Sequence, residues 1–299
     1  MTSTTRPGAM TGHDRFIDAG GLKIHYLDVP GGDPPIVLLH GLSANAHSFG
    51  GLIAAGLAPT FRVVAPDLRG RGQTDKPATG YAMADHARDV VALLDALGFD
   101  RPVVLGGHSF GAFLSTYVAA HYPDRVSKLI AIDAAITLDP RVGEMLKPSL
   151  DRLLRTSPSV DAYLADVRGA AYLAGMWDDA IEGYYRAELS VNPDGTVRSM
   201  TSASAIAQAL QAVIGAEQWK EIVARAKQPA ILINSTGAYG PPGSPPLVEE
   251  ANAREMAETF PNCRYVQVPG NHMTMMFGPG AAAIRDEITS FVRGDARGR

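Results

Sequence analysis

The sequence predicts an α/β fold: a mostly parallel, doubly wound sheet with an inserted helical segment. Short apolar runs bounded by turn residues alternate with amphipathic helical patterns, which is typical of a parallel sheet covered by helices on both faces. The alternation stops between residues 136 and 228, where helical patterns follow one another. With 299 residues, 46% of them hydrophobic and 19% charged, the chain can bury such a core.

The elements can be assigned in chain order. Residues 16–18 and 22–27 alternate around a Gly-containing turn, which predicts an antiparallel hairpin. Continuous apolar runs predict strands buried on both faces, and helical spacing predicts the covering helices. The predicted strands are 36–39, 61–65, a strand from Val103, 126–132, 230–234 and 264–268, and the first helices are 48–58 and 83–97.

Residues 136–228 are predicted to form a helical cap, or lid, with no strand of its own. Its helical patterns are 146–155, 160–169, 178–189 and 203–214. Because the segment lies between two core strands, we expect it to cover the carboxyl ends of the strands, where open α/β sheets bind ligands. The core then comprises residues 1–135 and 229–299, with residues 1–14 as a disordered tail.

Composition restricts the partners. A net charge of −4 and a pI near 6.1 provide no basic surface for nucleic acid, and no apolar run is long enough to span a membrane. The first residues lack the apolar core of a secretory signal, so we expect a cytoplasmic protein, monomeric or homodimeric. Cys263 is the only cysteine, which rules out an internal disulfide and a thiolate metal cluster.

The stretch Gly107-His108-Ser109-Phe110-Gly111 is the strongest functional signal. A buried-strand pattern precedes it and an amphipathic helix follows, as the Gly-x-Ser-x-Gly turn requires. A serine nucleophile needs a base, an acid that orients the base, and donors for the oxyanion. His272, on a Gly-containing loop after the last strand, is the predicted base.

These motifs resemble those of the α/β-hydrolase superfamily, in the branch with a helical cap, over nearly all of residues 16–293. The matching pieces are His40-Gly41 after the first buried strand, Asp67 to Asp75 after the second, the Ser109 turn, and Gly270-Asn271-His272. The resemblance implies Ser109 as nucleophile and His272 as base. It also implies an oxyanion hole built from backbone amides, here those of Leu42 and Phe110. The 67–75 loop is expected to be structural.

The position of the acid that orients the histidine differs from the commoner pattern of the family. Relatives usually carry it shortly after the strand that is here 230–234, but residues 235–246 contain no carboxylate. Some relatives with a cap place it after the preceding strand, where Asp133 stands in this chain. Asp133 is therefore the predicted acid, with Glu249 and Glu250 in reserve.

The predicted substrate is a small apolar or aromatic ester or lactone, cleaved with water and without metal or organic cofactor. Ser109 argues against the dehalogenases and epoxide hydrolases of this superfamily, which use a carboxylate nucleophile. Two alternatives stay open: a C–C hydrolase of ring-cleavage products, with Arg168, Arg186 or Asn192 binding a substrate carboxylate, and a non-catalytic ligand receptor. The candidate pocket residues are Phe113, Trp177, Tyr184, Met273 and Met276.

Overall fold

The computed structural model describes residues 12–214 and 219–294. Eight strands form one sheet in the order β1-β2-β4-β3-β5-β6-β10-β11. Their bounds are β1 His13–Ala19, β2 Leu22–Val29, β3 Ile36–Leu39, β4 Val63–Pro66, β5 Val103–His108, β6 Val126–Ile132, β10 Ala230–Asn234 and β11 Cys263–Gln267. The pairs β1/β2 and β2/β4 are antiparallel, and the pairs from β4 to β11 are parallel. The predicted α/β class and mostly parallel sheet are confirmed.

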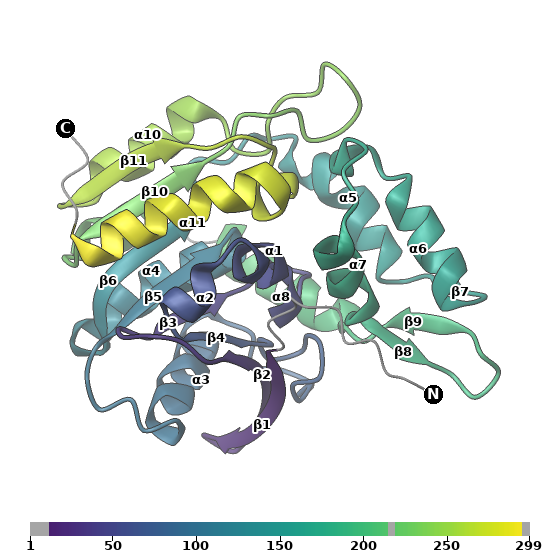
Figure 1. Cartoon of the computed structure of the whole chain (residues 1–299), viewed down its shortest axis with the longest axis horizontal. Helices are drawn as coiled ribbons and strands as arrows, with labels where there is room; N and C mark the ends of the chain where they lie inside the picture. Colours follow the sequence, from purple (N-terminus) through teal and green to yellow (C-terminus); the bar gives the residue numbers. More distant parts are fainter. Residues whose placement is uncertain (1–11, 215–218, 295–299) are drawn as a thin grey trace, which may run out of the picture.

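Helices cover both faces of the sheet (Figure 1). The helices α3 (Met83–Ala96), α4 (Phe110–His121) and α10 (Glu250–Thr259) bury their apolar residues in one core cluster. A second cluster on the other face includes α1 (Gly50–Ala54), α2 (Leu57–Thr60) and α11 (Gly278–Arg293). The strands β3, β4, β5 and β10 are buried along their whole length, which explains their uninterrupted apolar sequences.

Two details at the amino-terminal end differ from the prediction. The tail expected over residues 1–14 is wrong for residues 13 and 14, which begin β1, whereas residues 1–11 lie outside the described residues. Asp14 is anchored there because its carboxylate accepts hydrogen bonds from His25 and His47, at 3.0 and 2.9 Å. The predicted helix 48–58 is divided into a 3-10 turn, Ala46–Phe49, followed by α1 and α2.

Residues 136–228 contain helices and also a small sheet. The helices are α5 Val142–Arg152, α6 Val160–Arg168, α7 Asp179–Arg186, α8 Ala203–Ile214 and α9 Trp219–Arg225. The expectation of no strand is wrong, because β7 (Thr156–Ser157), β9 (Val197–Ser199) and β8 (Leu189–Val191) pair antiparallel in that order. Strands of two or three residues are too short to show a period of two. In Figure 1, α5, α6 and α7 lie to one side of the main sheet.

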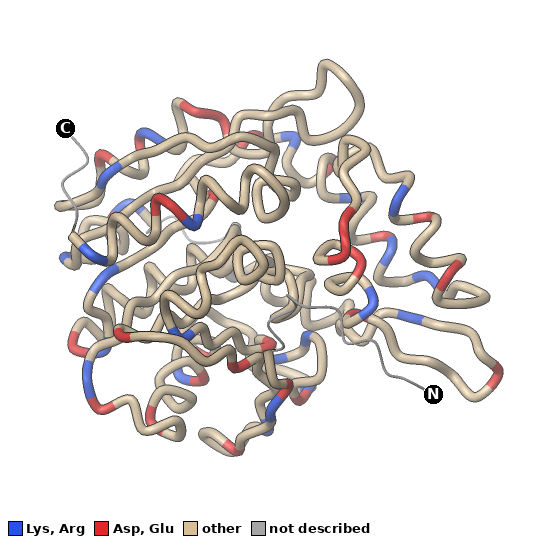
Figure 2. The backbone as a smooth tube through the Cα atoms, viewed as in Figure 1, with Lys and Arg blue, Asp and Glu red and all other residues tan. Residues whose placement is uncertain are grey.

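Charged residues of both signs are interspersed along the described backbone (Figure 2). This distribution agrees with the small net charge of −4. Among the described residues, no helix is both long enough and apolar enough to cross a membrane.

Candidate active site

Sheet register brings the predicted site residues together. His108 and Ile132 are paired across β5 and β6, and Ile132 is paired with Ile233 of β10. Ser109, Asp133 and the end of β10 therefore follow neighbouring strands at the same, carboxyl edge of the sheet. Ligands of open α/β folds bind at this edge.

Ser109 occupies a strained turn between β5 and α4. Its φ of 56° and ψ of −119° lie in a region that non-glycine residues rarely adopt. The flanking glycines permit this turn: a Cβ on Gly107 would lie 2.1 Å from the Gly111 carbonyl oxygen, and one on Gly111 would lie 1.8 Å from that of Leu39. The turn thus presents the serine where any larger neighbour would clash with backbone.

His272 lies beside Asp133. The His272 Nδ1 is 2.6 Å from Asp133 Oδ2, and both residues are buried. Asp133 Oδ1 accepts two further hydrogen bonds, from Asn234 Nδ2 at 2.8 Å and from the Ser235 amide at 3.0 Å. A carboxylate that accepts three hydrogen bonds is held in one orientation. The geometry is that expected of an acid orienting a base.

The sequence analysis missed Asn234 and Ser235. Asn234 is the last residue of β10, and Ser235 begins the segment in which a carboxylate was sought and not found. Here that position supplies hydrogen-bond donors to the carboxylate of the neighbouring strand. The signal was available, since parallel register places the residue after β6 beside the end of β10.

The reserve acids lie elsewhere. Glu249 is the N-cap residue of α10, and the exposed Glu250 pairs with Arg254 at 2.7 Å. Among the described residues, neither glutamate forms a hydrogen bond or ion pair with His272, whose Nδ1 is engaged by Asp133. The structure thus brings Asp133, and not the glutamates, to the histidine.

The loop that carries His272 is fastened from two sides. His108 Nε2 donates to the His272 carbonyl at 2.8 Å, and burial holds the pKa of His108 well below its ordinary value, so this ring is neutral. Asn271 Nδ2 donates to the carbonyls of Tyr172 and Ala238, each at 2.9 Å. Within the described part of the chain, the Ser109 hydroxyl makes no hydrogen bond, but Ser109 and His272 line the same two cavities.

The predicted oxyanion amides flank Ser109. Phe110 is the first residue of α4, so no helical carbonyl faces its amide. The Leu42 amide makes no hydrogen bond among the described residues. A Cβ placed on Gly41 would lie 3.6 Å from the Ser109 Cβ, so the Leu42 loop runs next to the serine.

Buried polar residues fix that loop from beneath. His40 donates from Nδ1 to the Gly41 carbonyl at 2.7 Å and accepts at Nε2 from the Leu68 amide at 3.0 Å. Burial lowers the pKa of His40 to about 4, so it is neutral near pH 7. Arg71 Nε donates to the Leu42 carbonyl at 3.0 Å. These contacts give the 67–75 loop a supporting role.

Two cavities meet at Ser109 and His272. We name the first the polar arm, and six of its lining residues are Ser149, Arg152, Tyr172, Tyr184, Tyr185 and Tyr239. We name the second the apolar arm, and it is lined by Phe110, Phe113, Leu138, Val142, Leu210 and Val213 among others. Each has a volume of about 70 Å³. Leu146 of α5 lines both arms.

Four of the five predicted pocket residues line these arms. Phe113 lines the apolar arm, and Tyr184, Met273 and Met276 line the polar arm. Trp177 does not belong with them. It stacks on Tyr185, and its Nε1 donates to Glu182 at 3.3 Å.

The three polar residues predicted to bind a substrate carboxylate are wrongly assigned, because none of them lines either arm. Arg168 and Arg186 are half exposed and pair with Glu182 on the cap surface. Asn192 Nδ2 donates to Thr196 within the β8–β9 turn. Arg152, which the sequence analysis did not single out, lines the polar arm instead. The cap helices contain several arginines, and nothing in the sequence distinguishes the one that lines the site from the others.

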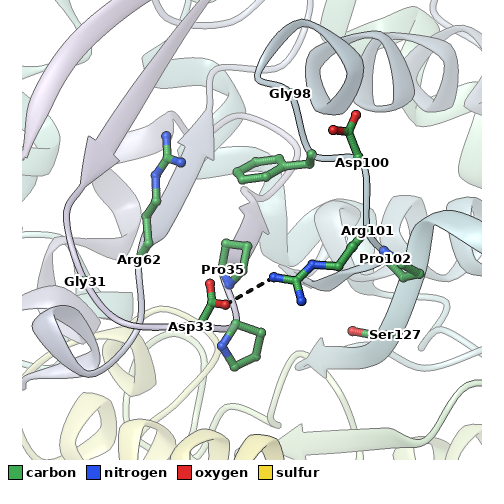
Figure 3. Close-up of a pocket in the computed structure, with 11 residues that line it drawn as sticks. Gly31, Asp33, Pro35, Arg62, Gly98, Asp100, Arg101, Pro102 and Ser127 are labelled. Atoms are coloured by element: carbon green, nitrogen blue, oxygen red, sulfur yellow. Dashed lines mark hydrogen bonds and ion pairs between the residues drawn. The ribbon is translucent and has the colours of Figure 1, made fainter.

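The larger cavity in Figure 3, about 650 Å³, lies away from this chemistry. Its lining includes Asp33, Pro35 and Pro102, which precede β3 and β5, so it lies at the amino ends of these strands. Arg101 and Asp33 form an exposed ion pair beside it. The candidate active site is at the opposite, carboxyl edge.

A family model described as the α/β hydrolase fold matches residues 34–279. A 2-(acetamidomethylene)succinate hydrolase from Mesorhizobium japonicum is 33% identical over 200 residues, which cover 65% of this chain and 68% of that protein. A soluble epoxide hydrolase from a Corynebacterium species is 38% identical over 124 residues, 42% of each chain. The crystal structure of an E-2-(acetamidomethylene)succinate hydrolase matches with a TM-score of 0.82 at 25% identity, covering 95% of this chain and 100% of that one.

Proposed function

The chain belongs to the α/β hydrolase family, and from that premise we propose that it is a serine hydrolase that cleaves a carboxylic ester or lactone. The observation that carries the proposal is the 2.6 Å contact between His272 Nδ1 and Asp133, at the edge where Ser109 is presented. A histidine whose Nδ1–H donates to a carboxylate leaves Nε2 as a free base. Such a base can take the proton of a serine hydroxyl.

The proposed reaction has two halves. Ser109 Oγ attacks the carbonyl carbon while its proton passes to His272 Nε2, and the oxyanion accepts hydrogen bonds from the Leu42 and Phe110 amides. The C–O bond to the leaving alcohol then breaks, and His272 returns the proton to that oxygen. Water, deprotonated by the same histidine, attacks the acyl carbon; the bond to Ser109 Oγ breaks, His272 returns the proton to that oxygen, and the acid leaves. Asp133 orients the ring and stabilises the imidazolium.

We propose that residues 136–228 act as a lid on this site. Leu146, Arg152 and Tyr184 come from this segment and line the cavities next to Ser109. A lid that closes the cavity excludes water from the oxyanion and strengthens its hydrogen bonds. The cytoplasmic location and the monomeric or homodimeric state remain predictions.

A second candidate is favoured by one comparison. The relative from Mesorhizobium japonicum is named for a substituted succinate, which is neither an ester nor a lactone. Cleavage of an amide, or of a C–C bond next to a carbonyl, uses the same serine, histidine and oxyanion hole and differs in the leaving group. The epoxide hydrolase similarity does not extend to the reaction, because Ser109 is not a carboxylate.

The test is turnover of 4-nitrophenyl acetate and butyrate by the wild type and by Ser109→Ala. We expect the variant to retain less than about a thousandth of the wild-type kcat, the scale of triad deletions. A fluorophosphonate should label the wild type at Ser109 and leave the variant unlabelled. Equal turnover by both proteins contradicts the nucleophile assignment. No turnover and no labelling favour the receptor alternative.

A further inference from the structure

Arg152 is the only arginine among the described residues that line the polar arm, and it is fixed in place there. The residue is only 6% exposed. Its Nη1 donates to both carboxylate oxygens of Glu188 at 2.6 Å and also to the hydroxyl of Tyr163. Its guanidinium lies 5.1 Å from the ring centroid of Tyr185. It also lies 5.8 Å from the ring centroid of Tyr163, so the cation is held through one nitrogen and by two aromatic rings.

The other edge of this guanidinium makes no hydrogen bond. Within the described part of the chain, neither Nε nor Nη2 of Arg152 donates one, and Nε is fully buried. The same edge binds carboxylates elsewhere in this protein: Arg62 donates from Nε and Nη2 to the two oxygens of Asp28, both at 3.0 Å. Arg69 binds Asp89 in the same way. Arg152 therefore lines the polar arm with two donors that no group of the described chain engages, and an unpaired guanidinium edge is matched to a carboxylate.

The tyrosines around Arg152 add neutral donors. Burial raises the pKa of Tyr184 far above its ordinary value and that of Tyr239 to about 12, so both hydroxyls stay protonated at neutral pH. The Tyr184 hydroxyl makes no hydrogen bond among the described residues. It can therefore donate to a bound anion.

Away from Ser109, Asp133 and His272, the apolar arm is lined by hydrocarbon side chains. Its walls are phenylalanine, leucine and valine side chains, and it adjoins a wider cavity of about 440 Å³ that Phe113, Leu138 and Leu210 also line. A ligand that spans Ser109 therefore meets donors on one side and hydrocarbon on the other.

We propose that Arg152 determines specificity by binding a carboxylate of the substrate in the polar arm, while an apolar group of the same substrate fills the apolar arm. The inference rests on the proposed function and narrows the substrate class to acidic esters or their amide and C–C counterparts. Glu188 sets the strength of this binding, because its charge balances Arg152 and repels a second carboxylate.

The competing explanation is that the Arg152–Glu188 pair has only a structural role. Substitutions that change the charge of the pair distinguish this role from carboxylate binding. Glu188→Gln keeps an acceptor for Nη1 and removes the repelling charge. If Arg152 binds a carboxylate, this variant prefers acidic over neutral esters more strongly than the wild type does. A structural pair predicts that both kinds of ester are affected equally.

The experiment uses the mono(4-nitrophenyl) esters of succinic, glutaric and adipic acid and the methyl ester of each, with the buffer rate subtracted. The measured quantity is the ratio of kcat/KM for the acid to that for its methyl ester. For the best chain length we expect a ratio of about 10 to 100 in favour of the acid, which is the scale of one charge-assisted hydrogen bond. The free dicarboxylates should inhibit hydrolysis of 4-nitrophenyl butyrate competitively, and their dimethyl esters should not.

Variants then test whether the preference for the acid depends on Arg152. Arg152→Lys should lower the ratio about 10-fold or more, because an ammonium lacks the two-donor edge. Glu188→Gln should raise it, and the matched control Arg186→Lys, on the cap surface, should leave it unchanged. If Arg152→Lys does not fold, the wild-type ratio and the inhibition pattern decide.

Ser109-dependent hydrolysis of the methyl esters with a wild-type ratio near one, and no inhibition by dicarboxylates, overturns this inference and leaves the proposed function standing. Dicarboxylates that bind calorimetrically and lose affinity in Arg152→Lys, in a protein that cleaves no ester, support the carboxylate site and overturn the ester hydrolysis.

Discussion

Replacing Asp133 by Asn is expected to reduce kcat by about 10⁴-fold, the scale seen for the same change in other triads. The structure determines which way the amide turns. Two donors, Asn234 Nδ2 and the Ser235 amide, face one oxygen of Asp133, so the new side chain must place its carbonyl oxygen there. Its NH₂ then faces His272 Nδ1, 2.6 Å away in the wild type. The ring is forced to carry its proton on Nε2 and cannot accept the proton of Ser109.

The reverse orientation is disfavoured because it sets the NH₂ against two donors and leaves buried groups without partners, at about 1–3 kcal/mol for each group. The fold should survive, since Asp133 has a φ of 51° and Asn is also tolerated in this region.

The assay is kcat for 4-nitrophenyl butyrate between pH 6 and 9, with the melting temperature as a check on folding. The matched control is Glu250→Gln, the same chemical change at an exposed residue that pairs with Arg254, and it should leave kcat within about twofold. A folded Asp133→Asn enzyme that keeps a tenth or more of the wild-type kcat refutes the reasoning.

Three further predictions concern the supports of the site. Gly111→Ala should destabilise the protein by about 1–3 kcal/mol or more in urea unfolding, because its Cβ would lie 1.8 Å from the Leu39 carbonyl oxygen; unchanged stability contradicts the close approach. The pKa of His40 is about 4 in the fold and about 6.5 in the unfolded chain. The unfolded chain therefore takes up a proton first, and the protein loses about 3 kcal/mol of stability as pH falls from 6.5 toward 4. His40→Gln should therefore show a shallower loss of stability over that interval, and an identical pH profile excludes the contribution. Tyr184→Phe should raise KM for the preferred ester several-fold, whereas Trp177→Phe should not, and equal effects contradict the cavity lining.

The sequence alone determined the fold class and the serine turn. Both depend on short-range constraints: strand and helix periods appear within a few residues, and the glycines at 107 and 111 are required by backbone atoms that lie against them. Asp133 was anticipated as well, from the resemblance to relatives with a cap that place the acid after the same strand.

The tertiary structure alone decided the rest. Arg152 and Glu188 are 36 residues apart and meet only when the end of α5 lies beside the residue that precedes β8, so no local pattern marks the arginine that lines the cavity. Trp177 and Tyr184 lie in one aromatic-rich stretch, and only packing puts the tyrosine in the polar arm. In the cap sheet, β7 pairs with β9, which lies about 40 residues further along the chain, and the strands are too short to show a pattern. These features depend on which surfaces meet, and that information is spread over the whole chain.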